Sequence, residues 1–181
     1  MSIKKFTTTI QGITPLLMHA YPMTPLPAGF EKMPGEEQAE WAAYRIKDTK
    51  ELYIPAIAIQ RTLVGAAKYS KGKGRASLQG NVAACVLVSP EYCGLGTTQY
   101  NIDARPVVIP ATGGRVLRYR PRLESGWVVS FDVEFDTELV SDKEVYKVIQ
   151  DAGTRVGFLD FRPACKGSFG RFIITDWAEA Q

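Results

Sequence analysis

The chain has 181 residues, of which 45% are hydrophobic and 23% charged, and its formal net charge is +3. This length and composition are those of an ordinary globular protein that can bury a core, and they exclude a disordered or fibrous chain. The small positive charge permits an anionic partner without requiring one, so the distribution of charge matters more than its sum.

The cysteines and the apolar runs define the expected surroundings. Cys85, Cys93 and Cys165 are odd in number and lack the CxxC spacing, which argues against a disulfide framework and a zinc site. We therefore expect a reduced, cytoplasmic compartment and no metal or other cofactor. No apolar run approaches the length of a membrane span, and the N-terminus lacks the apolar segment of a signal peptide, so we expect no membrane partner.

The first 70 residues predict a strand, a long loop and a helix. Alternation over 6–11 predicts a strand, and an apolar stretch over 13–19 follows, which ends at the only histidine, His19. Prolines at 22, 25, 27 and 34 predict an irregular loop, part of an insertion at about 14–51 that also holds a short helix at 36–45. Helical spacing of apolar residues predicts a helix over 55–69.

That helix leads into a basic, glycine-containing segment. Lys68, Lys71, Lys73 and Arg75 could follow a phosphate backbone. Alternatively, lysines at the end of a helix favour its negative pole and solubility. Next, 82–88 predicts a buried strand and 105–109 a short strand closed by Pro110, within an inserted strand region at about 78–110.

Two alternating segments then predict a hairpin. With a turn at 124–126, the strands 115–123 and 127–136 place Tyr119 opposite Phe131 and Arg118 opposite Asp132. The row Arg118, Arg120 and Arg122 is either a solvated face with cross-strand ion pairs or a platform for nucleic acid.

The last segment completes the predicted fold. Ser141 and Glu144 form a capping box that starts a helix, Gly153 stands where a C-terminal cap belongs, and 168–176 predicts a final strand. Without the insertions, the order is strand, helix, strand, strand, helix, strand. The sequence thus predicts one α+β domain over 1–181 with a ferredoxin-like (RRM-like) βαββαβ core, inserted strands and long loops.

A glycine-rich run over 157–171 combines small residues with rings and cations. Gly157, Gly167 and Gly170 alternate with Phe169 and with the cations Arg162, Lys166 and Arg171. Glycines allow close approach of the backbone, and rings and cations suit a planar, anionic ligand such as a nucleic-acid strand. The alternative is a loop that simply leads into a core strand.

Three motifs resemble the RAMP superfamily of CRISPR effector complexes, and within it the subunits that coat guide RNA as a filament. The first is the strand and turn that end in Leu17-Met18-His19, the second joins Leu52-Tyr53-Ile54-Pro55 to a helix, and the third is the glycine-rich run before the last strand. They occur in the family's order over most of the chain. The resemblance implies single-stranded RNA (or DNA) and further copies of the chain or other effector subunits as partners.

Departures from the family pattern narrow what the resemblance implies. Val64 stands where a family lysine would contact RNA, so only Lys68 carries over from that motif. The segment 41–45, where some family members place a cleaving aspartate, has no acidic residue. Target cleavage is therefore not implied, and the chain is short for such a subunit.

The leading hypothesis is a non-catalytic protein that coats a single strand within a multimeric ribonucleoprotein. Its predicted contacts are Lys68, Lys71, Lys73, Arg75, Arg162, Lys166, Phe169 and Arg171, with the glycines 157, 167 and 170. One alternative is a metal-independent endoribonuclease that uses His19. Another is a protein–protein adaptor or phage structural subunit. Asp48, Asp103 and Asp160 are too scattered in the sequence to predict a metal site.

Overall fold

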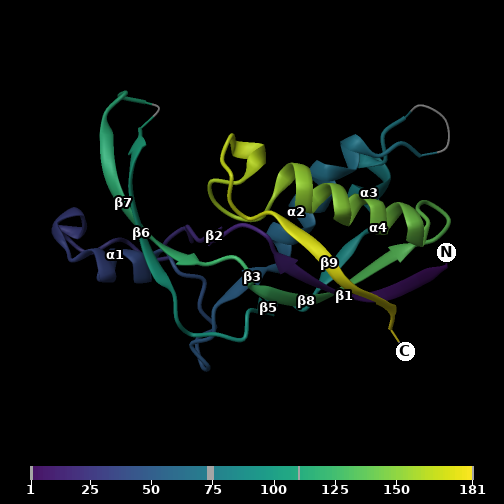
Figure 1. Ribbon diagram of the computed structural model, residues 1–181, viewed down its shortest axis with the longest axis horizontal. Helices are drawn as coiled ribbons and strands as arrows, with labels where there is room; N and C mark the ends of the chain where they lie inside the picture. Colours follow the sequence, from purple (N-terminus) through teal and green to yellow (C-terminus); the bar gives the residue numbers. More distant parts are fainter. Residues whose placement is uncertain (1, 73–75, 110, 181) are drawn as a thin grey trace.

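The computed structural model describes residues 2–72, 76–109 and 111–180 and has a mixed α+β architecture (Figure 1). Its main sheet is antiparallel, with the strand order β4-β8-β1-β9. The four strands are β1 (Ile3–Gly12), β4 (Leu87–Ser89), β8 (Val128–Asp136) and β9 (Phe172–Glu179). The first strand in the sequence is therefore central in the sheet.

One face of this sheet is covered by helices. Alternate residues of β1 and β8, such as Ile10 and Val129, are buried and lie opposite each other in register. Helices α2 (Ala56–Ala66) and α4 (Asp142–Asp151) pack over this face, and α3 (Gln79–Cys85) lies beside α2 (Figure 1). Tyr146 of α4 packs edge-on against Trp177 of β9. The hydrophobic core lies between these two layers.

Helix α4 begins as predicted but ends later. The capping box of Ser141 and Glu144 is confirmed. Gly153 is not the C-terminal cap, because the chain continues through a wide π-helical turn, Ala152–Val156, and reverses at Gly157, where φ is 73°. Gly153 serves close packing instead: a Cβ atom there would lie 2.2 Å from the carbonyl oxygen of Phe172. The sequence thus correctly indicated that position 153 needs a small residue. The reason is close contact with β9 and not a helix cap.

A second sheet carries the arginine row. Its order is β2-β7-β6, from β2 (Leu16–Leu17), β7 (Arg115–Leu123) and β6 (Asn101–Val108). The predicted hairpin of 115–123 with 127–136 is wrong, since β7 pairs with β6 and β2, while β8 pairs with β1 and β4. The β6–β7 ribbon projects from the body of the molecule, and α1 (Gly35–Trp41) packs against its base (Figure 1).

The segment after α2 also differs from the prediction. Residues 82–85 belong to α3, so only the end of the apolar run 82–88 is a strand. That strand, β4, joins the main sheet, and β6, which also lies within the predicted region of about 78–110, pairs with β7 in the second sheet. The predicted closure at Pro110 lies outside the described residues. A small sheet of β3 (Tyr53–Pro55) and β5 (Tyr92–Gly94) and single helical turns at Phe30–Lys32, Ala67–Tyr69 and Pro163–Cys165 complete the fold.

Candidate nucleic-acid interface

The glycine-rich loop is held by its own backbone and by the segment before β2. Phe158 donates its backbone N–H to the carbonyl of Gly170 at 2.9 Å, and Gly170 donates to Pro15 at 2.8 Å. Gly170 has a φ of 70°, and a Cβ atom there would lie 2.1 Å from the carbonyl oxygen of Phe158. A Cβ atom at Gly167 would lie 1.8 Å from the carbonyl oxygen of Phe161. Both glycines are thus required for close backbone approach.

Asp160, at the start of this loop, connects it to the β6–β7 ribbon. One guanidinium nitrogen of Arg120 donates to Asp160 at 2.5 Å, and another lies 3.5 Å from Asp103. The Arg120 side chain is only 4% exposed. His19 Nδ1 approaches the same Asp160 oxygen at 3.4 Å. Asp103 and Asp160 are therefore not isolated surface charges; Arg120 pairs with both.

The electrostatics of this network favour a charged Asp160. Burial raises the pKa of its carboxyl group, but hydrogen bonds from His19 and Arg120, the charge of Arg120 and the backbone N–H of Phe161 outweigh burial and hold the pKa well below its usual range. Asp160 thus stays ionised over the pH range in which proteins normally work. Arg120 makes the predicted cross-strand ion pair, with Asp103, but it is buried, so only the solvated part of that prediction is wrong for this residue.

Rings of the loop stack on cations of the ribbon. Arg105, which is paired with Asp103, lies 5.2 Å from the ring centre of Phe161 and 4.9 Å from that of Phe169. Arg122 lies 5.6 Å from the Phe169 ring. Phe169 is only 9% exposed, so it packs the loop against the ribbon rather than offering a free stacking surface. Phe161 keeps 37% of its surface exposed.

A channel runs beside the exposed side of α2. We call it the α2 channel; it encloses about 400 Å³ between the helix, the glycine-rich loop and the segment around His19. Its cations are Arg61 of α2 and Arg162 of the loop, and Tyr44 provides a ring. The Arg162 guanidinium donates to the carbonyl of Leu159 at 2.5 Å, so its side chain is held against the loop's own backbone. The remaining lining residues are His19, Pro55, Ile57, Ala58, Thr62, Leu159 and Asp160.

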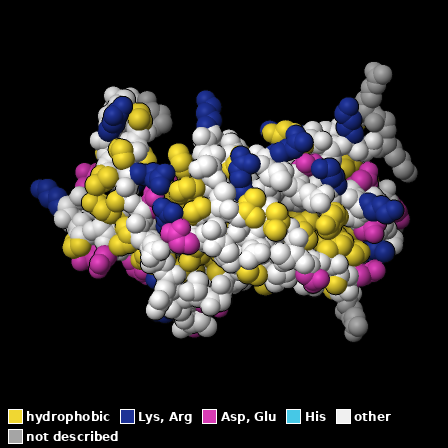
Figure 2. Space-filling view, viewed as in Figure 1, with side chains coloured by type: hydrophobic (Ala, Val, Ile, Leu, Met, Phe, Trp, Pro, Cys, Tyr) yellow, Lys and Arg dark blue, Asp and Glu magenta, His cyan; other side chains and the backbone are white. Residues whose placement is uncertain are grey.

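More cations lie beyond the far end of α2. Lys68 is exposed and lies 4.9 Å from the ring centre of Tyr69, and Arg155 lies 5.0 Å from the same ring. Arg171 donates to the carbonyl of Thr154 at 2.9 Å, so it points to this group and not to the ribbon. Figure 2 shows Lys and Arg side chains along this side of the molecule and in the notch between the ribbon and the loop.

The structure brings together only part of the predicted site. Arg162 and His19 meet in the α2 channel, whereas Lys68 and Arg171 do not line it and lie with the group beyond the end of α2. Lys71 and Lys166 are exposed, while Lys73 and Arg75 lie outside the described residues.

Two cations of this surface were missed in the sequence. Arg61 follows Ile57 and precedes Lys68 at helical spacing, so its exposed position on the helix was readable. Arg155 sits in the π-helical turn, for which the sequence gives no signal.

The uncovered face of the main sheet has the opposite charge. Asp132 and Glu134 of β8 lie there with Asp176 of β9, and Lys5 pairs with the first two at 2.9 and 3.7 Å. Thr7 donates to Asp132 at 2.7 Å. The acidic side chains of this face would repel a phosphate backbone.

No model of a known protein family matches the chain, and no curated protein is significantly similar to it. Within 2–72, 76–109 and 111–180, no group of three or more His, Cys, Asp or Glu side chains is arranged to hold a metal ion. The helices of these same ranges include none that is long and apolar enough to cross a membrane.

Proposed function

We propose that the protein binds single-stranded nucleic acid, most readily RNA, along the α2 channel without cleaving it. The observation that carries the proposal is the row of accessible cations from Arg162 past Arg61 to Lys68, on the side opposite the acidic sheet face. Arg61 and Lys68 are seven residues apart, about 10 Å along a helix, so they could contact two phosphates of one strand. Tyr44, Tyr69 and Phe161 border this path as rings for bases.

The proposal includes a ferredoxin-like core of the RAMP type. The order β9-β1-β8-β4, with α2 after β1 and α4 after β8, supports this assignment, with the ribbon as an insertion between β4 and β8. A coating protein also needs contacts between copies. The strongly exposed Tyr21 and Met23 in the loop before α1 are candidates for them.

The test is binding of labelled single-stranded RNA, single-stranded DNA and duplex by fluorescence anisotropy over a salt series, with light scattering on the same samples. Binding to single strands should grow with strand length and weaken steeply with salt. In the double variant Arg61→Gln/Lys68→Gln, the slope of log K against log salt should become shallower. The expected change is about 0.7 for each phosphate that the protein no longer neutralises.

Lys143→Gln is the matched control, since Lys143 is exposed in the first turn of α4, away from the channel. It should leave both the affinity and the slope unchanged. Absence of binding at low salt, or equal effects of the channel and control variants, would refute the proposal.

A second candidate function has a specific observation in its favour. His19 lies in the α2 channel and is oriented by Asp160, with the phenol of Tyr44 in the same lining. A metal-independent endoribonuclease can use such a pair for general acid–base catalysis. Incubation of a labelled RNA with wild type and with His19→Ala in EDTA distinguishes the two functions. Cleavage that requires His19 would favour the endoribonuclease, and RNA that stays intact would favour binding without cleavage.

A further inference from the structure

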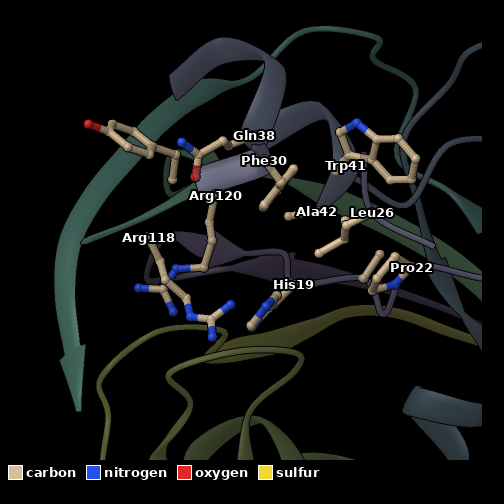
Figure 3. A pocket seen from close by; sticks show the side chains of 11 residues that line it. His19, Pro22, Leu26, Phe30, Gln38, Trp41, Ala42, Arg118 and Arg120 are labelled. Carbon is tan, nitrogen blue, oxygen red and sulfur yellow. The ribbon is translucent and has the colours of Figure 1, made fainter. Parts of the chain in front are cut away.

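A small pocket behind the glycine-rich loop combines flat apolar walls with hydrogen-bond donors. It lies between the 19–30 segment, α1 and β7 and has a volume of about 70 Å³ (Figure 3). We call it the Trp41 pocket. Phe30 and Trp41 meet edge to face there, with ring centres 6.4 Å apart, and Leu26 adds an aliphatic wall. In Figure 3 these side chains lie on one side, and His19, Arg118 and Arg120 are grouped on the other.

The donors at the second side are incompletely used by the protein. Arg120 is buried and its two terminal nitrogens face Asp160 and Asp103, while its Nε makes no hydrogen bond within the described part of the chain. The side chain of Arg118 is exposed and makes no hydrogen bond or ion pair with the described residues, although its backbone pairs in the β6–β7 ladder. Of the two arginines, the exposed Arg118 is the one whose donors a ligand oxygen in the pocket can reach, and pairing them would favour such a ligand.

This lining selects a planar ligand with acceptor oxygens. Phosphate would leave the ring side of the pocket unfilled, and a purely apolar ring would leave the arginine donors unpaired. A keto nucleobase, uracil or guanine, presents its ring to the apolar wall and a carbonyl oxygen to Arg118. Adenine places an amino donor at the corresponding edge, where it would face other donors.

The pocket lies next to the proposed path of the strand. His19 lines both the Trp41 pocket and the α2 channel. A nucleotide that leaves the channel at His19 could therefore turn its base into the pocket while its phosphate stays with the channel cations. We propose that the Trp41 pocket receives the carbonyl edge of one unstacked keto base of the strand, an inference that rests on the proposed function.

The decisive experiment separates base from backbone. Anisotropy is measured on an abasic single strand of fixed length and on the same strand with one uracil, guanine, adenine or cytosine at its centre. We expect uracil or guanine to tighten binding at least about fivefold over the abasic strand, and adenine to have no effect. Arg118→Gln should abolish this gain, whereas Arg61→Gln should weaken all five strands by the same factor.

Controls make each outcome decisive. Arg115→Gln removes an exposed arginine of the same strand, β7, that does not line the pocket, and it should leave the base preference intact. A 5-iodouracil at the central position should crosslink on irradiation to the peptide that holds Trp41. Strand binding without base preference, a preference that survives Arg118→Gln, or crosslinks only elsewhere would overturn the pocket assignment and leave the strand-binding function standing.

If no strand binds, the proposed function fails and the pocket is tested by itself. Saturation-transfer NMR with free uridine and adenosine then serves as the readout. Uridine contact that disappears in Arg118→Gln supports a keto-base pocket, and the same weak signal for both nucleosides, or none, refutes it.

Discussion

At the scale of single residues, Asp160 has the largest structural role in the candidate site. It accepts hydrogen bonds from Arg120 and from the backbone of Phe161, and it orients His19. Arg120 is buried, so its charge depends on Asp160 and Asp103 for compensation. One carboxylate thus fixes the position of the glycine-rich loop relative to the ribbon and the geometry of the only histidine.

We expect Asp160→Asn to destabilise the protein. Removing one partner of a buried ion pair leaves an uncompensated charge, and because 29% of the Asp160 side chain is exposed we expect a loss in unfolding free energy of about 2–3 kcal/mol. Urea unfolding at pH 7 measures it. Asp176→Asn, an exposed residue of β9, is the control and should change little; equal losses in the two variants would contradict the role of the pair.

The same residue predicts how stability responds to acid. Its folded-state pKa is lowered, so the folded protein binds the proton less readily than the unfolded chain, where aspartate titrates near pH 4. Its contribution is complete above about pH 4 and is lost as the pH falls below that value. The gap in unfolding free energy between wild type and Asp160→Asn should therefore be constant from pH 7 to about pH 4 and should narrow between pH 4 and pH 3. A gap that stays constant down to about pH 3 would exclude a titrating carboxylate.

At the scale of elements, the glycine-rich loop depends on backbone contacts that only glycine permits. Gly170→Ala would place a methyl group against the carbonyl of Phe158 at a positive φ, so we expect a loss of more than about 2 kcal/mol. Gly80→Ala is the contrasting variant. Gly80 lies in α3 with nothing within 4 Å of its Cβ position, and alanine should stabilise it by about 0.5–1 kcal/mol. Thermal unfolding of both variants checks the two signs.

Elements with strong local signals were predictable from the sequence. The capping box of Ser141 placed α4, and apolar spacing placed α2, because both depend on residues close in the sequence. The pairing of β7 was not predictable. Alternation fixes which side chains share a face of a strand, but it does not say which strand lies next to it, and β7 pairs with β6 across the tip of the ribbon.

The same limit applies to the site. Gly157, Gly167 and Gly170 were identifiable because glycines among rings and cations mark close backbone approach. The partnership of Arg120 with Asp103 and Asp160 depends on where the ribbon packs, which no local pattern encodes. Phe169 was predicted as a contact for bases, but the arginines of the ribbon cover it.

At the scale of the whole molecule, the modest net charge conceals two sides of opposite sign. The helical side carries Arg61, Lys68 and Arg155, and the uncovered sheet face carries Asp132 and Glu134. A net charge of +3 is therefore an incomplete guide to the affinity for an anion, because the two sides face different directions. From this distribution we predict that the position of an added charge, and not the total charge of the protein, controls the affinity for a single strand.

Gly65→Lys tests this prediction while leaving every native cation in place. Gly65 lies on α2 between Arg61 and Lys68, and a Cβ atom there meets only Val156, at 3.9 Å. A lysine at this position should tighten binding to a single strand and steepen the slope of log K against log salt by about 0.7, as expected when one more phosphate is neutralised. The helix should also become slightly more stable, because glycine is a poor helix former.

Asp176→Asn raises the net charge by the same amount on the opposite side. If the strand follows α2, this control leaves the affinity and the salt slope at their wild-type values. Should both variants strengthen binding equally, the interaction would depend only on the overall charge of the protein. The α2 channel would then have no special role, and the strand would have to be located by crosslinking over the whole surface.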